Sequence, residues 1–319
     1  MEKIFLNKFL GGVSMLNRVK SDVFSQLWET FSSHVIEVPR IQSYIQRHFQ
    51  EELIQDHFAI IDLPGPNTGM DTLTCLFSYL GYRVRGQDYL IEKQNNFRWL
   101  SEDVSSETLA VEASPQIVVA DFRREELAPQ VLKIIDHYAG FAQALDNELL
   151  KFLHCRTLQQ DEEAAVKLSK LIINYLKFRH WPLPTLQEYE IVKNQNELLA
   201  WVLVMGRQVN HFAWGIHLSK GFSQLKKFNQ LLSSTLNISL NEKGGVIKGN
   251  TNTGIEQTAT QPTIRPVKLA DGVIALPDRF IEFVWRHPKK AGETRLWHDY
   301  FTGFVANNAD RVVESLLCK

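Results

Sequence analysis

Two histidines and one glutamate stand out in this sequence as side chains that could hold a metal ion. His57 and His211 lie in the stretches DHFAIID and NHFAWGI, which share His-Phe-Ala after an Asp or an Asn. Glu282 lies in RFIEFVWR, with apolar residues two positions away on both sides. Because an unpaired buried carboxylate is costly, Glu282 needs a proton, a cationic partner or a metal.

Two strand histidines and one strand glutamate are the composition of a 2-His-1-carboxylate metal site. Three ligands on one side of the ion leave the opposite positions open for a substrate and for dioxygen or water. These ligands suit Fe(II), with Zn, Ni or Mn as alternatives. Each residue taken alone also has a structural explanation. A lone strand histidine is more often a hydrogen-bonded packing residue, and Glu282 could instead pair with Arg279, Arg286 or Arg265.

Strand alternation predicts where the two histidines point. The small residues Ala213 and Gly215 share the face of His211, whereas the bulky residues of the same stretch share the other face. The bulky face must pack on helices, so we expect His57 and His211 to look into the concave side of a sheet. His217 falls on the same predicted face and is a candidate substrate contact, with a strand-edge histidine as the alternative.

The order of elements around the two histidines predicts an internal repeat. Each histidine is followed by a strand, a turn, a helix and several short strands, so we expect an α+β fold of two paired βαβββ modules within one catalytic domain. The predicted parts are a helical N-terminal segment (1–56), a first module (57–124), a helical insertion (125–206), a second module (207–290) and a C-terminal tail (291–319). Within the second module, the polar stretch GNTNTGIEQTATQ predicts a loop or flap.

Composition narrows the function further. The formal net charge of −1 argues against a nucleic-acid partner, since phosphate binding needs a concentrated positive surface. No apolar run approaches the roughly 18 residues of a membrane span. The three cysteines are too few and too scattered for a disulfide framework, and the first residues lack a convincing secretory segment. We therefore expect a cytoplasmic enzyme, and the oligomeric state is left open.

The motifs DHFAIIDL, NHFAWGIHL and RFIEFVWR, in this order, resemble the metal motifs of the 2-oxoadipate dioxygenase/decarboxylase (hydroxyglutarate synthase) family. That family is similar in core fold to the vicinal-oxygen-chelate (glyoxalase-like) superfamily, whose paired βαβββ modules form a metal-holding cup. The resemblance covers most of the chain. It implies that His57, His211 and Glu282 bind Fe(II), and that a small 2-oxo acid is oxidatively decarboxylated and hydroxylated with dioxygen.

One position departs from the family pattern. The family has an arginine four residues after its first histidine, which holds the substrate carboxylate, and this chain has Ile61 there. An apolar side chain cannot make that bidentate charged contact. Arg265, Arg83 and Arg123 are the candidates to replace it, unless the substrate differs.

The sequence thus predicts a metal-dependent dioxygenase/decarboxylase of a small 2-oxo acid. Two alternatives remain open at this point. The same cup could serve a glyoxalase-type metal-dependent lyase, isomerase or hydrolase that uses Zn or Ni and no oxygen, or it could be a ligand-binding cup without turnover.

Overall fold

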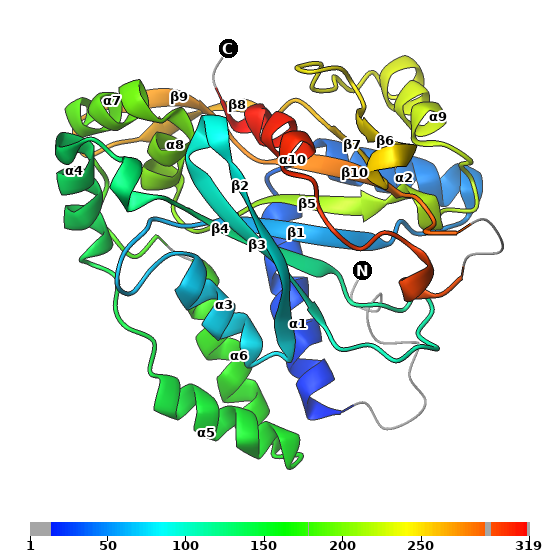
Figure 1. The fold of residues 1–319 in the computed structure, drawn as a ribbon, viewed down its shortest axis with the longest axis horizontal. Coiled ribbons are helices and arrows are strands. Elements are labelled where there is room, and N and C mark those ends of the chain that lie inside the picture. Colours follow the sequence, from blue (N-terminus) through cyan, green and yellow to red (C-terminus); the bar gives the residue numbers. More distant parts are fainter. Residues whose placement is uncertain (1–13, 178, 291–294, 318–319) are drawn as a thin grey trace.

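A curved eight-stranded sheet runs through the centre of the computed structural model, which describes residues 14–177, 179–290 and 295–317 (Figure 1). In sheet order the strands are β2 (Tyr82–Leu90), β3 (Asn95–Glu102), β4 (Gln116–Phe122), β1 (Gln55–Ile61), β5 (Val209–Gly215), β10 (Phe280–Arg286), β7 (Ile255–Ala259) and β6 (Lys248–Asn250). Residues 1–13 of the predicted N-terminal segment, and 291–294 and 318–319 of the predicted tail, lie outside the described residues.

The two halves of this sheet have the same internal order, as the predicted repeat requires. In the first module β1 is parallel to β4, and in the second module β5 is parallel to β10. Strands β1 and β5 pair antiparallel at the centre and join the modules. The module helices are α3 (Met70–Ser78) and α9 (Leu225–Gln230), and a separate hairpin, β8 (Ile264–Lys268) and β9 (Val273–Pro277), is inserted before β10. The prediction of paired βαβββ modules is confirmed.

The central pair of strands carries two irregularities at equivalent places. Going from Gln55 to His57, β1 advances two residues while β5 advances one, so Asp56 is the extra residue. The same happens on β5, where Asn210 is the extra residue before His211. A bulge of this kind turns the extra side chain away from strict alternation. Asp56 and Asn210 can therefore lie on the same face as the histidines that follow them.

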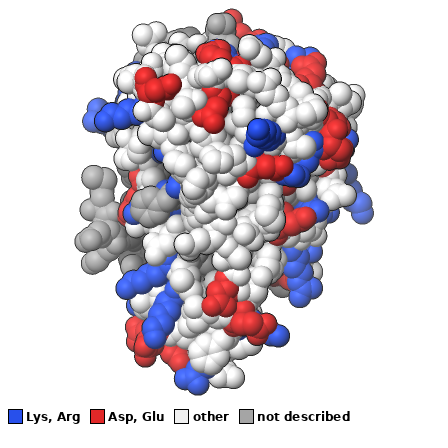
Figure 2. Space-filling view, turned by 90° about the vertical axis from the view of Figure 1, so that its left-hand side faces the viewer, with Lys and Arg blue, Asp and Glu red and all other residues white. Residues whose placement is uncertain are grey.

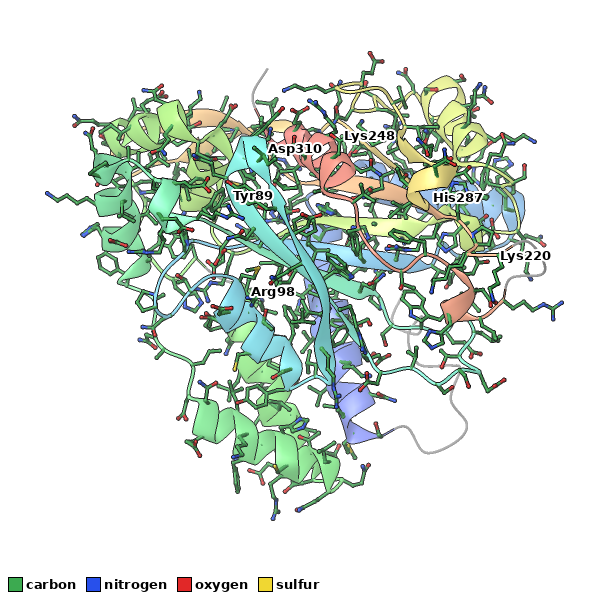
Figure 3. The ribbon with its side chains drawn as sticks, in the orientation of Figure 1. Tyr89, Arg98, Lys220, Lys248, His287 and Asp310 are labelled. Carbon is green, nitrogen blue, oxygen red and sulfur yellow. The ribbon has the colours of Figure 1, made fainter. Side chains whose placement is uncertain are left out.

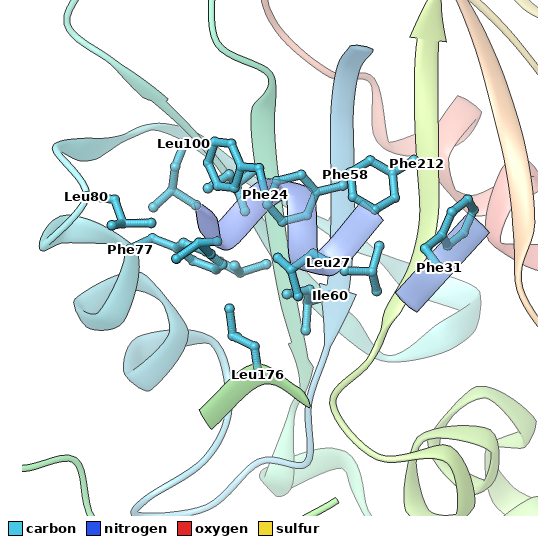
Figure 4. Packing of buried hydrophobic residues seen from close by; sticks show 14 of the residues in the cluster. Phe24, Leu27, Phe31, Phe58, Ile60, Phe77, Leu80, Leu100, Leu176 and Phe212 are labelled. Atoms are coloured by element: carbon cyan, nitrogen blue, oxygen red, sulfur yellow. The ribbon is translucent and has the colours of Figure 1, made fainter. Parts of the chain in front are cut away.

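Helices cover the convex face of the sheet, and the bulky face of each central strand packs on them as expected. The helices of this layer include α1 (Met15–Ser32), α2 (Glu37–Phe49), α5 (Asn147–Leu158) and α6 (Glu162–Lys177). Phe24 of α1 packs on Phe58 at 5.4 Å between ring centroids, and Phe31 packs on Phe212 at 5.0 Å (Figure 4). Fully burying one such ring contributes about 1.5–3 kcal/mol to folding.

The concave face is closed by the C-terminal part of the chain. Helix α10 (Ala306–Val313) contacts β2 at one edge of the sheet and β6 and β7 at the other, and it lies across the sheet in Figure 1. Three helices of the insertion, α4 (Pro129–Ala139), α7 (Leu186–Gln195) and α8 (Glu197–Met205), complete a second apolar core on this side. The curved sheet therefore encloses space between its concave face and α10.

Two local predictions are wrong. Strand β5 ends at Gly215, and His217 lies in the 3-10 turn Ile216–Leu218 instead of continuing the strand. The stretch predicted as a loop contains β7, an inner strand that pairs with both β6 and β10. Thr258 of this strand has high β-propensity, and Ile255 and Ala259 are fully buried, so strand pairing outweighs the polar composition.

The described surface gives no sign of a membrane span or of a single-sign charge patch on the face drawn in Figure 2. None of the helices in the described ranges is long and apolar enough to cross a bilayer. On the face in Figure 2, lysine and arginine side chains are interspersed with acidic ones.

Candidate metal centre

The three side chains singled out in the sequence meet on the concave face. One ligand atom from each of His57, His211 and Glu282 lies within 4.8 Å of the other two, and all three residues are buried. They come from the adjacent strands β1, β5 and β10. Ala213 pairs with His57 on one side and with Glu282 on the other, so a small side chain separates the two. This arrangement leaves room between the three larger side chains.

Glu282 Oε2 is the point at which the two histidines converge. His211 Nε2 lies 3.2 Å from this oxygen and His57 Nε2 lies 3.5 Å from it. The other carboxylate oxygen, Oε1, accepts a 2.8 Å hydrogen bond from Gln257 Nε2. Oε2 itself is buried without a hydrogen-bond partner. A buried, unpartnered carboxylate oxygen facing two imidazole nitrogens fits a divalent cation, and two nitrogens with one oxygen are the donor set of the facial triad.

A buried ion pair orients His57. Its Nδ1–H donates to Asp56 Oδ1 at 2.7 Å, which leaves Nε2 as the atom that can bind a cation. Arg286 in turn donates from Nε and Nη2 to the two oxygens of Asp56 at 2.7 and 2.8 Å. Arg286 Nη1 donates to the carbonyl groups of Phe301 and Gly303. Arg286 therefore serves Asp56, and the alternative in which it pairs with Glu282 is wrong.

These contacts set the protonation of the group. Burial would raise the pKa of Asp56, but the Arg286 guanidinium and the His57 hydrogen bond hold it well below its usual range. Burial would lower the pKa of His57, but the charge of Glu282 and the bond to Asp56 raise it to about 9. Burial lowers the pKa of His211 to about 4. Without a metal, His57 at neutral pH therefore carries a second proton on Nε2, which a cation bound there would replace.

His211 is held mainly by packing. Its ring stacks on Phe280 at 4.8 Å between centroids with an interplanar angle of 21°. Its Nδ1 has no hydrogen-bond partner, and neither does the amide of Asn210, which is fully buried beside it. The two ligand histidines thus differ in how they are held: His57 by a hydrogen bond to a carboxylate, and His211 by ring stacking and burial.

A cavity that is partly open to solvent extends from the three ligands between the sheet and α10. Near the ligands it is lined by Asn210 and Gln257. Most of the remaining wall is apolar and comes from the first module and the C-terminal segment: Ala59, Ile61, Leu90, Phe97, Val118, Ala120, Phe304, Ala309, Val312 and Val313. Ligands, amides and an apolar wall make this a site for a small molecule.

The residues predicted to bind substrate do not line this cavity. Arg83 is exposed on β2 and pairs with Asp103 at 3.2 Å. Arg265 donates to the carbonyl of His34 and pairs with Asp278 at 3.2 Å. Both positions lie on short or edge strands whose outward side the sequence could not distinguish from the concave side.

His217 and Arg123 also lie elsewhere. The ring of His217 packs on Tyr300 at 4.8 Å between centroids, because the turn after Gly215 carries it out of the alternation of β5. Arg123 stacks on the ring of Tyr89 and pairs with Glu126 at 3.1 Å. The predicted substrate-binding role of these side chains has no support in their positions.

Sequence reasoning missed three polar residues of the site: Asp56, Asn210 and Gln257. The Asp or Asn before each His-Phe-Ala was visible as part of the repeat, but strict alternation assigned it to the opposite face. Only the bulges bring it beside the histidine. Gln257 lay in the stretch predicted as a loop, where the alternation of Ile255, Gln257 and Ala259 was the available signal.

Comparisons with known proteins point to one family. Residues 23–315 match the family model described as 2-oxoadipate dioxygenase/decarboxylase. A chloroplastic 2-oxoadipate dioxygenase/decarboxylase of Arabidopsis thaliana is 33% identical over 142 residues, which are 42% of this chain and 38% of that protein. The chloroplastic/amyloplastic protein of that name from Oryza sativa subsp. japonica is 23% identical over 303 residues, covering 92% of this chain and 77% of the relative.

A solved structure shares the fold. The hydroxyglutarate synthase from Oryza sativa, crystallised in complex with 2-oxoadipate, superposes with a TM-score of 0.73. The match covers 96% of this chain and 94% of that one, at 21% sequence identity. At this identity the likeness establishes the common architecture of paired modules.

Proposed function

Because the chain belongs to the 2-oxoadipate dioxygenase/decarboxylase family, we propose that it is a metal-dependent dioxygenase and decarboxylase of a 2-oxo acid. The observation that carries the proposal is the convergence of His57, His211 and Glu282 on one point of a buried cavity. The relatives are named for activity on 2-oxoadipate, and the similar Oryza sativa structure is a complex with that acid. Fe(II) is the proposed metal, since two imidazoles and one carboxylate suit it.

The proposed reaction converts R–CH2–CO–COOH and O2 into R–CH(OH)–COOH and CO2. The bond between the carboxyl and keto carbons breaks, and the carboxyl group leaves as carbon dioxide. One oxygen atom of O2 enters the new carboxyl group, and the other forms the hydroxyl group on the neighbouring carbon. The organic acid is oxidised and dioxygen is reduced, so no further oxidant or reductant is needed.

In this reaction the residues of the chain bind the metal and orient the groups that hold it. Fe(II), when held by the three ligands, supplies the redox chemistry that dioxygen requires. Asp56 fixes the tautomer of His57, so Nε2 keeps its lone pair for the metal. Gln257 fixes the rotation of the Glu282 carboxylate through Oε1. The apolar wall limits water around the reacting groups.

The decisive test is metal analysis of anaerobically purified protein, followed by oxygen uptake with Fe(II) and a panel of 2-oxo acids. The proposal predicts one divalent ion per chain and oxygen consumption matched by carbon dioxide release. Turnover of a 2-oxo acid without oxygen consumption would instead support the glyoxalase-type alternative. A protein that binds no divalent metal would contradict the proposed site. The cytoplasmic location stays a prediction.

A further inference from the structure

The two ends of the cavity differ in chemistry. The end at the metal ligands is polar, with the amides of Asn210 and Gln257 beside Glu282. The other end is formed by β1, β3 and β4 on one side and by α10 on the other. It is lined by aliphatic and aromatic side chains, with Ile61 and Phe97 at 3% exposure each. A bound 2-oxo acid with its oxo and carboxyl groups at the metal must place its side chain at this apolar end.

The apolar end has no cationic side chain that could pair with a second carboxylate. Among the lining residues, all of which belong to the described part of the chain, there is no lysine or arginine. Asn95 is the polar residue on the wall formed by β3, and its amide nitrogen already donates to the carbonyl of Asp121 at 2.8 Å. The second N–H of this amide remains as a neutral donor, which holds a carboxylate less strongly than a lysine or arginine would.

Cations around the cavity are already paired. Arg286, which lies 5.0 Å from the centroid of the lining Phe304 ring, binds Asp56. Lys93 lies among acidic side chains, 3.4 Å from Glu314 and 3.7 Å from Asp310 of α10. Lys248, on β6, donates to the carbonyl of Asn241. Figure 3 shows Lys248 and Asp310 by α10, at the upper edge of the sheet. Recruiting either lysine would leave carboxylate or carbonyl groups without their present partner.

From these observations we infer that this enzyme prefers 2-oxo acids with an uncharged, apolar side chain over dicarboxylic 2-oxo acids. The inference rests on the proposed function and specifies its substrate class. A side-chain carboxylate would be desolvated without a cation to compensate its charge, which is unfavourable, whereas an alkyl or aromatic group would be buried against Ile61, Phe97 and Val118. The balance of the reaction is unchanged, because the side chain beyond the hydroxylated carbon does not react.

The sharpest test compares 2-oxohexanoate with 2-oxoadipate. The two acids have the same six-carbon chain and the same oxo acid group, and they differ only in a methyl or a carboxylate at the far end. The Fe(II)-loaded protein should consume oxygen with 2-oxohexanoate at a kcat/KM at least about 100-fold above that for 2-oxoadipate. A kcat/KM for 2-oxoadipate equal to or above that for 2-oxohexanoate would overturn the inference.

A binding measurement separates this inference from the proposed reaction. If neither acid supports oxygen uptake, the proposed reaction is contradicted. Calorimetry on the Mn(II)-loaded protein then still measures which of the two acids binds more tightly. Tighter binding of 2-oxohexanoate supports the apolar end, and tighter binding of 2-oxoadipate, or binding of neither acid, overturns it.

A change of charge at the wall should shift the preference. Ile61→Arg places a cation on the strand face of His57 and should lower the ratio of the two kcat/KM values at least tenfold. Ile61→Met is the matched control and should keep the ratio. Because Ile61 is buried, Ala309→Arg on the half-buried part of α10 is the second variant, with the same expected direction. If both arginine variants fold and the ratio of kcat/KM values for the two acids stays unchanged, the apolar end does not select substrates by charge.

Discussion

The two modules supply one histidine each to the metal centre, but the surroundings of the histidines differ in charge. In the first module, Asp56 occupies the bulge and hydrogen-bonds His57, and Arg286 holds Asp56. In the second, Asn210 occupies the equivalent bulge, and neither its amide nor His211 Nδ1 has a partner. His57 is thus oriented by hydrogen bonds that run through Asp56 to Arg286, and His211 is oriented by stacking and burial.

The strand register explains this difference. His57 pairs with Gln116 on β4, and His211 pairs with Phe280 on β10, so the two parallel pairs can be aligned. By this alignment Glu282 corresponds to Val118, which lines the apolar wall. One copy of the repeat therefore supplies the carboxylate ligand, and the other copy supplies a surface for the substrate side chain.

The same alignment places Phe122 at the position equivalent to Arg286. An aspartate at 210 would have no arginine opposite it and would be a buried, unpaired charge. A neutral Asn210 is therefore the compatible residue in the second module. The charged pair Asp56 and Arg286 therefore corresponds by register to the neutral residues Asn210 and Phe122.

Removal of either histidine tests what the two halves share, and it should have the largest effect. His57→Ala or His211→Ala should weaken metal binding by more than about 100-fold, because loss of a ligand exceeds the 10–100-fold cost of losing its hydrogen-bond partner. Elemental analysis and metal titration measure the effect. His217→Ala, which lies outside the cavity, is the control and should retain the metal. Full metal occupancy in both ligand variants would refute the centre.

Removal of Arg286 tests the charged half. Arg286→Met leaves Asp56 as an uncompensated buried charge and should lower the free energy of unfolding by about 3–5 kcal/mol. Phe122→Leu, at the equivalent position of the other module, should cost about 1.5 kcal/mol or less. Urea unfolding of both variants checks the difference. Equal losses would mean that the ion pair has no special role in the first module.

Exchange of the bulge residues tests whether the charge belongs to one module. Asp56→Asn should weaken metal affinity by about 10–100-fold, because His57 loses its charged acceptor. Asn210→Asp added to this variant should not restore the affinity, since Arg286 lies beside position 56. Competition with a chelator of known affinity measures both variants. Recovery in the double variant would show that the two halves are interchangeable.

The pH dependence of metal binding compares the two histidines, and it is the smallest of the expected effects. The metal must displace a proton from His57, whose pKa is raised to about 9, so affinity should rise by about tenfold per pH unit towards pH 9 and then level off. His211, with a pKa lowered to about 4, is already neutral above pH 5 and adds no slope there. Titrations at pH 6–9 test the slope, and titrations above pH 9 test the plateau. In Asp56→Asn the plateau should begin at lower pH, and an unchanged plateau would argue against the role of Asp56.

Local patterns in the sequence were sufficient for the repeat, the two histidines and the glutamate. The shared His-Phe-Ala and the matching order of elements predicted equivalent strands, and apolar neighbours on both sides of Glu282 predicted its burial. These features depend on alternation along a strand, which residues a few positions apart determine. The helical insertion was recognisable for the same reason, since its apolar spacing is local.

Only the tertiary structure determined the hydrogen-bond partners of the metal ligands and the cavity wall that faces them. Asp56 and Arg286 are 230 residues apart, and they meet because β1 and β10 both flank β5. The bulges turn Asp56 and Asn210 towards the histidines against strict alternation, and the turn after Gly215 carries His217 away. The apolar wall exists because α10 bridges the two edges of the sheet. Side-chain type and period thus determined the ligands, whereas register, bulges and long-range closure, which no local pattern encodes, determined their partners and the shape of the cavity.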